Sequence, residues 1–276
     1  MKVMTIFIII MIIVAGLTTV SAVKINENKI ETEYDANPYT PTNNFGKYAV
    51  VISGGVGGDP QHHTWANTGL HAKNVFQAKG YTVEFLDEPT ENQVNDAISN
   101  IHASKVCLYL VDHGTSSSNP EKKGMVLNRN FEILTPNELR SLVNTISADT
   151  ITIVIDICHA GMFIPALSGK DRVIITSSDS HGLSFTHSFN LFGETFFSKI
   201  FLDELEKGKS YGEAWEETDN KMDNPFYIYN LIFLEMPLII ANAKIDDNGD
   251  GIGSGTFFRD KLENLKDGDL AKDLYP

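Results

Sequence analysis

Two apolar runs, each ending in a polar motif, decide the fold of this chain: VCLYLVDHG at 106–114 and ITIVIDICHAG at 151–161. Neither run carries a charge before its polar motif, which begins at Asp112 in the first run and at Asp156 in the second. Such uncharged apolar runs are typical of strands buried on both faces of a parallel sheet. Three more strands are expected, at 48–53, 81–86 and 172–177. We therefore expect a mostly parallel sheet whose two faces are both covered.

Segments with helical spacing of apolar residues alternate with these strands. They cover 64–79, 90–103, about 190–207 and 210–222, and a further helix opens at Pro136 with Thr135 as its N-cap. A polar loop is expected at 115–123, and a short apolar stretch lies at 236–241. The sequence thus predicts an α/β fold with a mostly parallel sheet of about six strands and helices on both faces.

The start of the chain has the features of an export signal. Residues 1–22 carry one lysine, then an apolar run, then small residues that end in Val20-Ser21-Ala22. This order is typical of a secretory signal peptide, and cleavage is expected after Ala22. An uncleaved anchor is the alternative, because the apolar run approaches the length that spans a bilayer. Either way the protein is expected to be secreted or extracytoplasmic, with membrane contact only through an uncleaved anchor.

The rest of the chain divides into three parts. Residues 23–46 are polar and contain Asn-Pro and Thr-Pro pairs, so they are interpreted as an N-terminal arm. The main domain is expected over 47–242, where all the predicted strands and helices lie. A C-terminal segment, 243–276, follows it.

The net charge of the chain disfavours two classes of binding partner. The net charge of -14 argues against binding to nucleic acid or to an anionic membrane, because those surfaces repel an acidic protein. The glycines at 54–58 lack the spacing of a nucleotide-binding loop, and Asp59-Pro60 stands where a helix should begin, so no nucleotide is expected. The expected partner is a protein or peptide substrate.

Residues with catalytic chemistry follow two of the predicted strands. His113 and Gly114 come after the strand at 106–111, and Cys158 comes after the strand at 151–155. In open α/β sheets, ligands bind beyond the carboxyl ends of the strands, so neighbouring strands would bring the thiol and the imidazole to one crevice. Acyl transfer needs this pair, together with backbone N–H groups that hold the oxyanion. Gly114 and Cys158 are the expected N–H donors.

The simplest interpretation of each cysteine is that it is a buried structural residue of the hydrophobic core. The chain has only two, Cys107 and Cys158, so disulfide staples are not expected. Cys107 lies in mid-strand and is interpreted as core. Taken alone, Cys158 would be too, but its placement at the end of a strand that follows the His113 strand favours chemistry.

The two motifs resemble those of the caspase-like cysteine peptidases. Asp-x-Cys-His-small-Gly at 156–161 is similar to the metacaspase motif, while YLVDHGT at 109–115, YAVVISGG at 48–55 and His71-Ala72 look closer to the legumain family of asparaginyl endopeptidases and its prokaryotic relatives. The resemblance covers about 47–240. It implies a caspase-like sheet and a dyad of Cys158 and His113 that are not in tight contact before substrate binds. It also implies an oxyanion hole at Gly114.

Asp156 is the expected determinant of specificity. It ends an apolar strand two residues before Cys158, and a buried carboxylate either pairs internally or waits for a cation. In metacaspases and clostripain-like relatives the matching aspartate binds arginine or lysine before the scissile bond. Legumains add an arginine that would fall near Thr64, where this chain has His62-His63-Thr64, so cleavage after a basic residue is favoured. Ser184 is expected in the pocket wall.

The sequence thus predicts an exported cysteine endopeptidase that acts through a thioester acyl-enzyme, with cleavage after Arg or Lys. Cleavage after Asn or Asp, transpeptidation, and a catalytically silent binding domain of the same fold remain as alternatives. No cofactor is required for this chemistry.

A calcium loop is expected near the end of the chain. Asp246, Asn248 and Asp250 occupy positions 1, 3 and 5 of a D-x-N-x-D-G motif, and the carbonyl of Ile252 occupies position 7. Position 12 is Phe257 instead of Glu, and Asp260 is a candidate replacement ligand. An ordinary Asp/Asn/Gly-rich turn is the alternative. The histidines show no zinc-type spacing with cysteines, so no second metal site is expected.

Overall fold

The computed structural model describes residues 46–56, 59, 62–184, 193–222, 242–255, 267 and 269–276. The predicted signal peptide at 1–22, nearly all of the arm at 23–46, the stretch at 236–241, Phe257 and Asp260 lie outside this part of the chain. Within the described part, no helix combines the length and the apolar character needed to cross a membrane.

The main sheet has the strand order β2-β1-β3-β7-β8-β9 among the described residues. Its strands are β1 (Lys47–Ser53), β2 (Tyr81–Asp87), β3 (Lys105–Val111), β7 (Thr150–Asp156), β8 (Arg172–Thr176) and β9 (Lys244–Asp246). The first five run parallel, and β9 is antiparallel to β8. The predicted mostly parallel sheet is confirmed. Its last strand comes from the segment at 243–276, which therefore contributes to the sheet.

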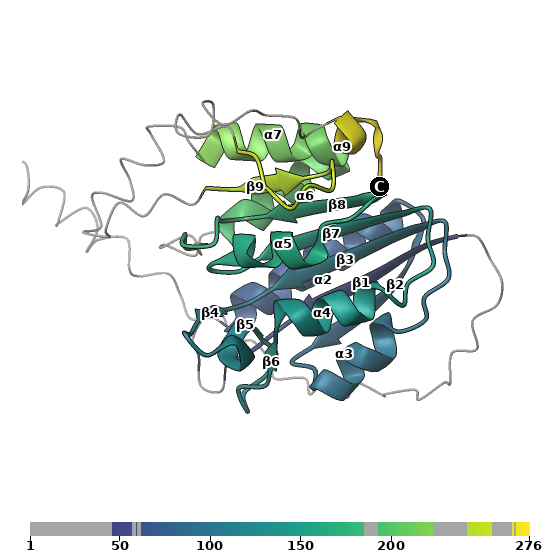
Figure 1. The fold of residues 1–276 in the computed structure, drawn as a ribbon. Helices are drawn as coiled ribbons and strands as arrows, with labels where there is room; N and C mark the ends of the chain where they lie inside the picture. Colours follow the sequence, from purple (N-terminus) through teal and green to yellow (C-terminus); the bar gives the residue numbers. More distant parts are fainter. Residues whose placement is uncertain are drawn as a thin grey trace, which may run out of the picture. The chain divides into compact units, whose positions relative to one another are not determined.

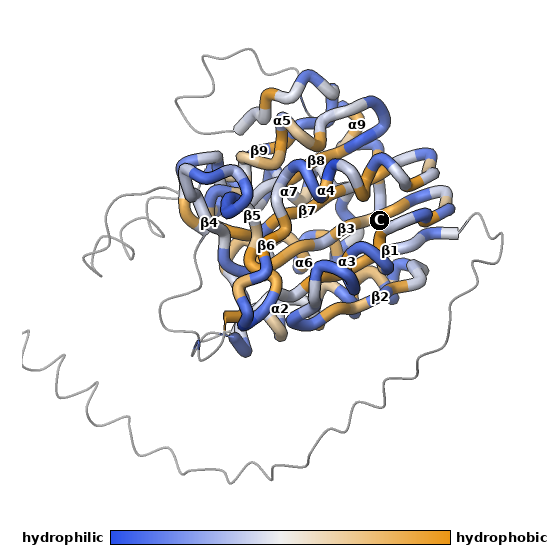
Figure 2. Tube along the Cα trace, turned by 60° about the horizontal axis from the view of Figure 1, so that its bottom comes forward, coloured by the Kyte–Doolittle hydropathy of each residue, from blue (hydrophilic) through white to orange (hydrophobic). Residues whose placement is uncertain are grey.

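Helices cover both faces of this sheet, as expected (Figure 1). One face carries α3 (Glu91–Ile98), α4 (Pro136–Val143), the 3-10 turn η2 (Ala160–Phe163) and α5 (Ile164–Leu167). The other carries α2 (His62–Ala78), α6 (Phe196–Glu206), α7 (Tyr211–Met222) and α9 (Asp269–Asp273). The central strands β3 and β7 are accordingly hydrophobic over most of their length, as Figure 2 shows in orange.

Side chains along β3 alternate between the two cores. Val106, Leu108 and Leu110 contact the core beneath α3 and α4, whereas Cys107 and Tyr109 contact the core beneath α2 and α6. All five are buried. Because successive side chains of a strand point to opposite faces, an uninterrupted apolar run is the pattern that a doubly covered strand needs. Cys107 is a core residue, as predicted.

The ends of two helices show where local signals succeed and fail. Thr135 and Glu138 form a capping box at the start of α4, with Pro136 in the first turn, as predicted. The helix expected over 90–103 is shorter, because α3 ends at Ile98. Ser99 is extended and Asn100 has a φ of 61°, so the backbone turns away from helical geometry there.

A second, small antiparallel sheet was not predicted. It contains β4 (Gly114–Ser116), β5 (Lys123–Val126) and β6 (Ile133–Leu134), with the 3-10 turn η1 (Pro120–Lys122) between the first two strands. The expected polar loop at 115–123 is therefore wrong in part. Its first strand begins directly after His113, so this sheet borders the edge where the polar motifs lie.

Candidate active site

The strands that carry the two polar motifs are neighbours. β3 and β7 pair in parallel, and Val111 is opposite Asp156 at the end of the ladder. The N–H of Asp112 donates to the carbonyl of Asp156 at 3.4 Å. Both motifs thus leave the sheet at the same carboxyl edge, where open α/β sheets bind their ligands.

Gly114 brings the two motifs into contact beyond that edge. A β-carbon placed on Gly114 would overlap the carbonyl oxygen of Cys158 and would lie 2.9 Å from its carbonyl carbon and 3.2 Å from its nitrogen. No side chain fits between these two backbones. Glycine is required at 114 for this close approach.

The turn that holds Cys158 is fastened by the segment after β8. His159 adopts a left-handed φ of 63°, which closes the turn before η2, and its N–H donates to the carbonyl of Gly182 at 2.8 Å. The hydroxyl of Ser178 donates to the carbonyl of Ile157 at 3.0 Å. These contacts fix the backbone of the thiol while leaving it at the surface of the core.

Cys158 is partly buried, and its thiol donates to the carbonyl of Ser184 at 3.5 Å. Burial raises the pKa of the thiol above its ordinary value; the backbone of Ser184 opposes this in part, and the charge of Asp156 adds to it. The resting site therefore holds a protonated thiol at neutral pH, and a base is needed to generate the thiolate.

His113 is held by two residues from the first part of the domain. Its Nε2 lies 2.6 Å from Oδ2 of Asp59, and its ring lies 4.6 Å, between centroids, from the ring of Trp65 on α2. The imidazole side chain keeps 40% of its surface exposed, so it stays accessible to a substrate. Neither contact joins the imidazole to the thiol of Cys158.

Asp59 was missed by the sequence reasoning. The only signal was its position in the polar turn after β1, where Asp59-Pro60 was used to argue against nucleotide binding. The carboxylate lies 54 residues before the histidine that it contacts, and no local pattern reports such a pair.

Asp156 is buried at the end of β7, with 1% of its surface exposed. Oδ1 accepts a hydrogen bond from the hydroxyl of Ser184, and Oδ2 accepts from the hydroxyls of Thr195 and Ser198, all at 2.5 Å. Of the two options expected for this carboxylate, internal pairing is the one observed. The partners are neutral, and among the described residues no lysine or arginine forms an ion pair with Asp156.

Ser184 contacts both the thiol of Cys158 and the carboxylate of Asp156. Its carbonyl accepts from the Cys158 thiol, and its hydroxyl donates to Asp156. The structure therefore brings Cys158, Asp156 and Ser184 together, and Gly114 and His113 lie on the adjoining loop.

Asp112 is a second buried carboxylate at this edge that the sequence reasoning did not single out. Its carboxylate packs against Gly54, where a β-carbon would overlap Oδ2. Neither oxygen accepts a side-chain hydrogen bond among the described residues. Burial raises the pKa of Asp112 to about 8; the backbone of His113 opposes the shift, whereas Asp59 and Glu88 increase it.

The residues predicted to bind calcium also lie together. Asp246 ends β9 and is buried, and one carboxylate oxygen from each of Asp246, Asp250 and Asp267 lies within 4.8 Å of the others. Asn248 accepts the N–H of Asp250 at 2.8 Å, and the N–H of Ile252 donates to Asp250 at 2.8 Å. Asp267 was not predicted.

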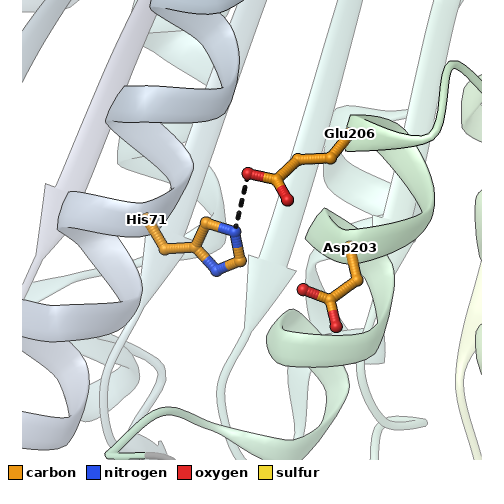
Figure 3. A group of neighbouring side chains, drawn as sticks. All are labelled: His71, Asp203 and Glu206. Carbon is orange, nitrogen blue, oxygen red and sulfur yellow. Dashed lines mark ion pairs between the residues drawn. The ribbon is translucent and has the colours of Figure 1, made fainter.

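A separate cluster joins α2 to α6 through His71 (Figure 3). Its Nδ1 lies 2.7 Å from Glu194 and its Nε2 lies 3.4 Å from Glu206, while Asp203 is paired with Lys199 at 2.5 Å. Burial lowers the pKa of His71, but the acidic neighbours raise it more, so the net pKa is above its ordinary value. His71 and its acidic neighbours therefore form an ion-pair network that links α2 to α6.

Comparison with known proteins identifies the fold. No family model matches the sequence, and a search of curated proteins finds no match either. Among solved structures, the chain is similar to caspase-1 from Spodoptera frugiperda, with a TM-score of 0.51 over 75% of this chain and 92% of that one, at 12% sequence identity. The expected caspase-like α/β fold is confirmed, whereas the resemblance to legumains and metacaspases remains a prediction.

Proposed function

We propose that this chain is an exported cysteine endopeptidase in which Cys158 is the nucleophile and His113 is the general acid and base. The contact between Gly114 and the backbone of Cys158 carries the proposal, because it brings both motifs to one edge of a caspase-like sheet. The features of a signal peptide at 1–22 supply the argument for export.

The chemistry is a two-step acyl transfer. His113 accepts the thiol proton as the sulfur of Cys158 attacks the scissile carbonyl carbon, and the tetrahedral intermediate then expels the amine, which takes its proton from His113. The product is a thioester on Cys158. Water then attacks the thioester and gives a proton to His113, and the tetrahedral intermediate expels the sulfur, which takes this proton from His113, so that the peptide acid and the free thiol are released.

Two backbone N–H groups are available to hold the oxyanion. The N–H of Val126 donates to the carbonyl of His113 at 3.0 Å, so Gly114 and Met125 form a non-hydrogen-bonded pair in the antiparallel ladder. The N–H of Gly114 is therefore not used between these strands. With the N–H of Cys158 close to it, the pair supplies the donors that stabilise a tetrahedral oxyanion.

Asp59 supports the role of His113 by orienting the ring. A carboxylate on one ring nitrogen stabilises the imidazolium that forms when the thiol is deprotonated, and it leaves the other nitrogen to face the substrate. The distance of 2.6 Å between Nε2 and Oδ2 is suited to this charge-assisted hydrogen bond.

Cleavage after arginine or lysine is the specificity that we propose. Three hydroxyls solvate Asp156, but they leave its negative charge uncompensated. The carboxylate lies two residues before the thiol and close enough to raise the pKa of Cys158. A basic side chain entering beside Cys158 would gain a favourable interaction with this charge, which for arginine can be bidentate.

The test is hydrolysis of fluorogenic peptides that vary the residue before the scissile bond. Cys158→Ala should abolish turnover, because the nucleophile is removed, and His113→Ala should lower it by about 10²–10⁴-fold. His159→Ala is the matched control, since the neighbouring imidazole has no assigned role, and it should lose far less. A Cys158→Ala protein that still turns over, with an electrophilic peptide attached to Cys107 instead, would contradict the proposal.

A further inference from the structure

The loop that follows β9 is folded tightly against α5. Asp246 ends the strand opposite Ile174, and Gly249 and Gly251 both adopt a left-handed φ of 79°. A β-carbon on Gly249 would lie 3.1 Å from the carbonyl oxygen of Gly169, just after α5. Glycine is required at such positions, because other residues are strained there. The loop therefore has a defined path beside the end of α5.

Three carboxylates converge in this loop. One oxygen from each of Asp246, Asp250 and Asp267 lies within 4.8 Å of the others. Among the described residues, none of the three forms an ion pair with a lysine or an arginine. Like charges so close together need a positive partner.

A buried oxygen of Asp246 points to what that partner is. The residue is fully buried, Oδ1 accepts from the N–H of Gly249 at 3.1 Å, and Oδ2 accepts no hydrogen bond of normal geometry from the residues that the structure describes. The hydroxyl of Ser168 interacts with the same carboxylate, and it lies 3.9 Å from a β-carbon placed on Gly251. Leaving a carboxylate oxygen poorly paired inside a protein is costly, so Oδ2 of Asp246 needs a ligand. A cation satisfies the carboxylate and neutralises the cluster.

The donor set selects the cation. Every candidate ligand offers oxygen, and no histidine or cysteine belongs to the cluster. Carboxylate, amide and carbonyl oxygens suit a hard cation, and a loop with ligands at alternate positions suits the flexible coordination of calcium better than the strict octahedron of magnesium. We propose that Asp246, Asn248, Asp250 and Asp267 bind Ca²⁺, together with the carbonyl of Ile252.

The ion would fasten the end of the chain to the main sheet. Asp267 accepts from the hydroxyl of Ser254 at 2.5 Å, and Asp247 accepts the N–H of Ala271, in α9, at 2.8 Å. α9 in turn contributes to the core beneath α7. Binding therefore links β9 to the segment that carries α9, and removal of the ion leaves three repelling carboxylates at that junction.

The experiment compares the full chain in calcium and in EGTA. Calcium should raise the melting temperature by several degrees, through preferential binding to the folded state. Asp267→Asn and Asp250→Asn should erase most of this shift, and the exposed Asp250 protects the test against a variant that fails to fold. Asp273→Asn is the matched control, because it removes an exposed carboxylate of the same segment outside the loop, and it should keep the full shift.

Two further measurements make the test decisive. Titration calorimetry should give one calcium per chain for the native protein and none for Asp250→Asn. Limited proteolysis should release the C-terminal segment faster in EGTA than in calcium. Identical melting curves in calcium and EGTA, or a shift that Asp250→Asn and Asp267→Asn both retain, would overturn the proposal. None of these readouts uses peptide hydrolysis, so the outcome is independent of the proposed peptidase activity.

Discussion

Cys107 lies in β3 and Cys158 follows the neighbouring strand β7, but the two residues differ in their surroundings. Cys107 is fully buried between β3 and α2, and burial raises the pKa of its thiol to about 12. Cys158 is partly exposed beyond the end of β7, where its thiol contacts the carbonyl of Ser184 and the loop that carries His113 lies next to it. A thiol reagent should therefore reach Cys158 and spare Cys107, because only an accessible thiolate reacts.

Asp59→Asn tests whether this carboxylate positions His113. The substitution keeps the size of the side chain but weakens stabilisation of the imidazolium, so kcat should fall by about 10-fold or more while KM for a small peptide stays within a few-fold. Asp59→Glu should recover part of the rate. An unchanged kcat would contradict this role. A lower kcat that is accompanied by a lower melting temperature would show that Asp59 has only a structural role.

Asp156→Asn tests the proposed specificity. Loss of the charge should lower kcat/KM for substrates with arginine before the scissile bond by about 10²-fold, because a desolvated charge pair is broken. Alkylation of Cys158 by iodoacetamide should not become slower, since Asp156 raises the pKa of the thiol. Ser198→Ala is the control, because it removes one hydroxyl partner and keeps the carboxylate. A native enzyme that prefers Asn or Asp would refute this assignment.

At the scale of elements, α6 and α7 are joined by a charged junction. Glu204 of α6 keeps 3% of its side chain exposed and contacts Lys207, Lys209 and Lys221, the last of them on α7. Burial favours the neutral acid, but the three lysines prevail and lower the pKa of Glu204 to about 2. The junction therefore depends on an ionised carboxylate.

Glu204→Gln should destabilise the protein by about 1–3 kcal/mol at pH 7, because three partly exposed lysines lose their shared partner. The pKa of Glu204 is lower in the folded state than its ordinary value of 4.5. Its contribution is thus complete above about pH 4.5 and is lost as the pH falls toward 2. Denaturant unfolding at pH 7 and pH 3 checks this, with the exposed Glu216→Gln as control; an equal difference at both pH values would contradict the prediction.

The whole domain is organised by one sheet with two cores. The central strands β1, β3 and β7 are paired on both sides and covered on both faces. The small sheet β4–β6 borders the site and has short strands, two of them at its edges. Local stability should therefore differ between the two sheets. The central strands should open least readily and position the site, whereas the small sheet at its border should open more readily.

Hydrogen exchange measures this difference. Amides of β1, β3 and β7 should exchange slowest, with opening free energies close to global unfolding, while those at 114–134 should exchange orders of magnitude faster. Mass spectrometry of peptic fragments at neutral pH is sufficient to compare them. Equal protection of 114–134 and β3 would show that the two sheets open as one unit.

Much of the fold and part of the site are local properties of the sequence. The apolar runs of β3 and β7, the capping box at Thr135 and the glycine after His113 are each recognisable within a few residues, because strand pattern, helix caps and backbone freedom are short-range effects. The placement of His113 and Cys158 at strand ends follows from the same patterns. Local sequence patterns are therefore sufficient to predict the fold class and the dyad that we propose.

Contacts between residues that are distant in the sequence depend on tertiary packing. Asp59 lies 54 residues before His113, three hydroxyls reach Asp156 from 28 to 42 residues away, and Asp267 reaches the proposed calcium loop from beyond the motif. The short strands of β4–β6 likewise depend on pairing with one another. Such contacts are set by the path of the chain over the sheet. No local pattern encodes that path, because it is chosen by the packing of whole elements against each other.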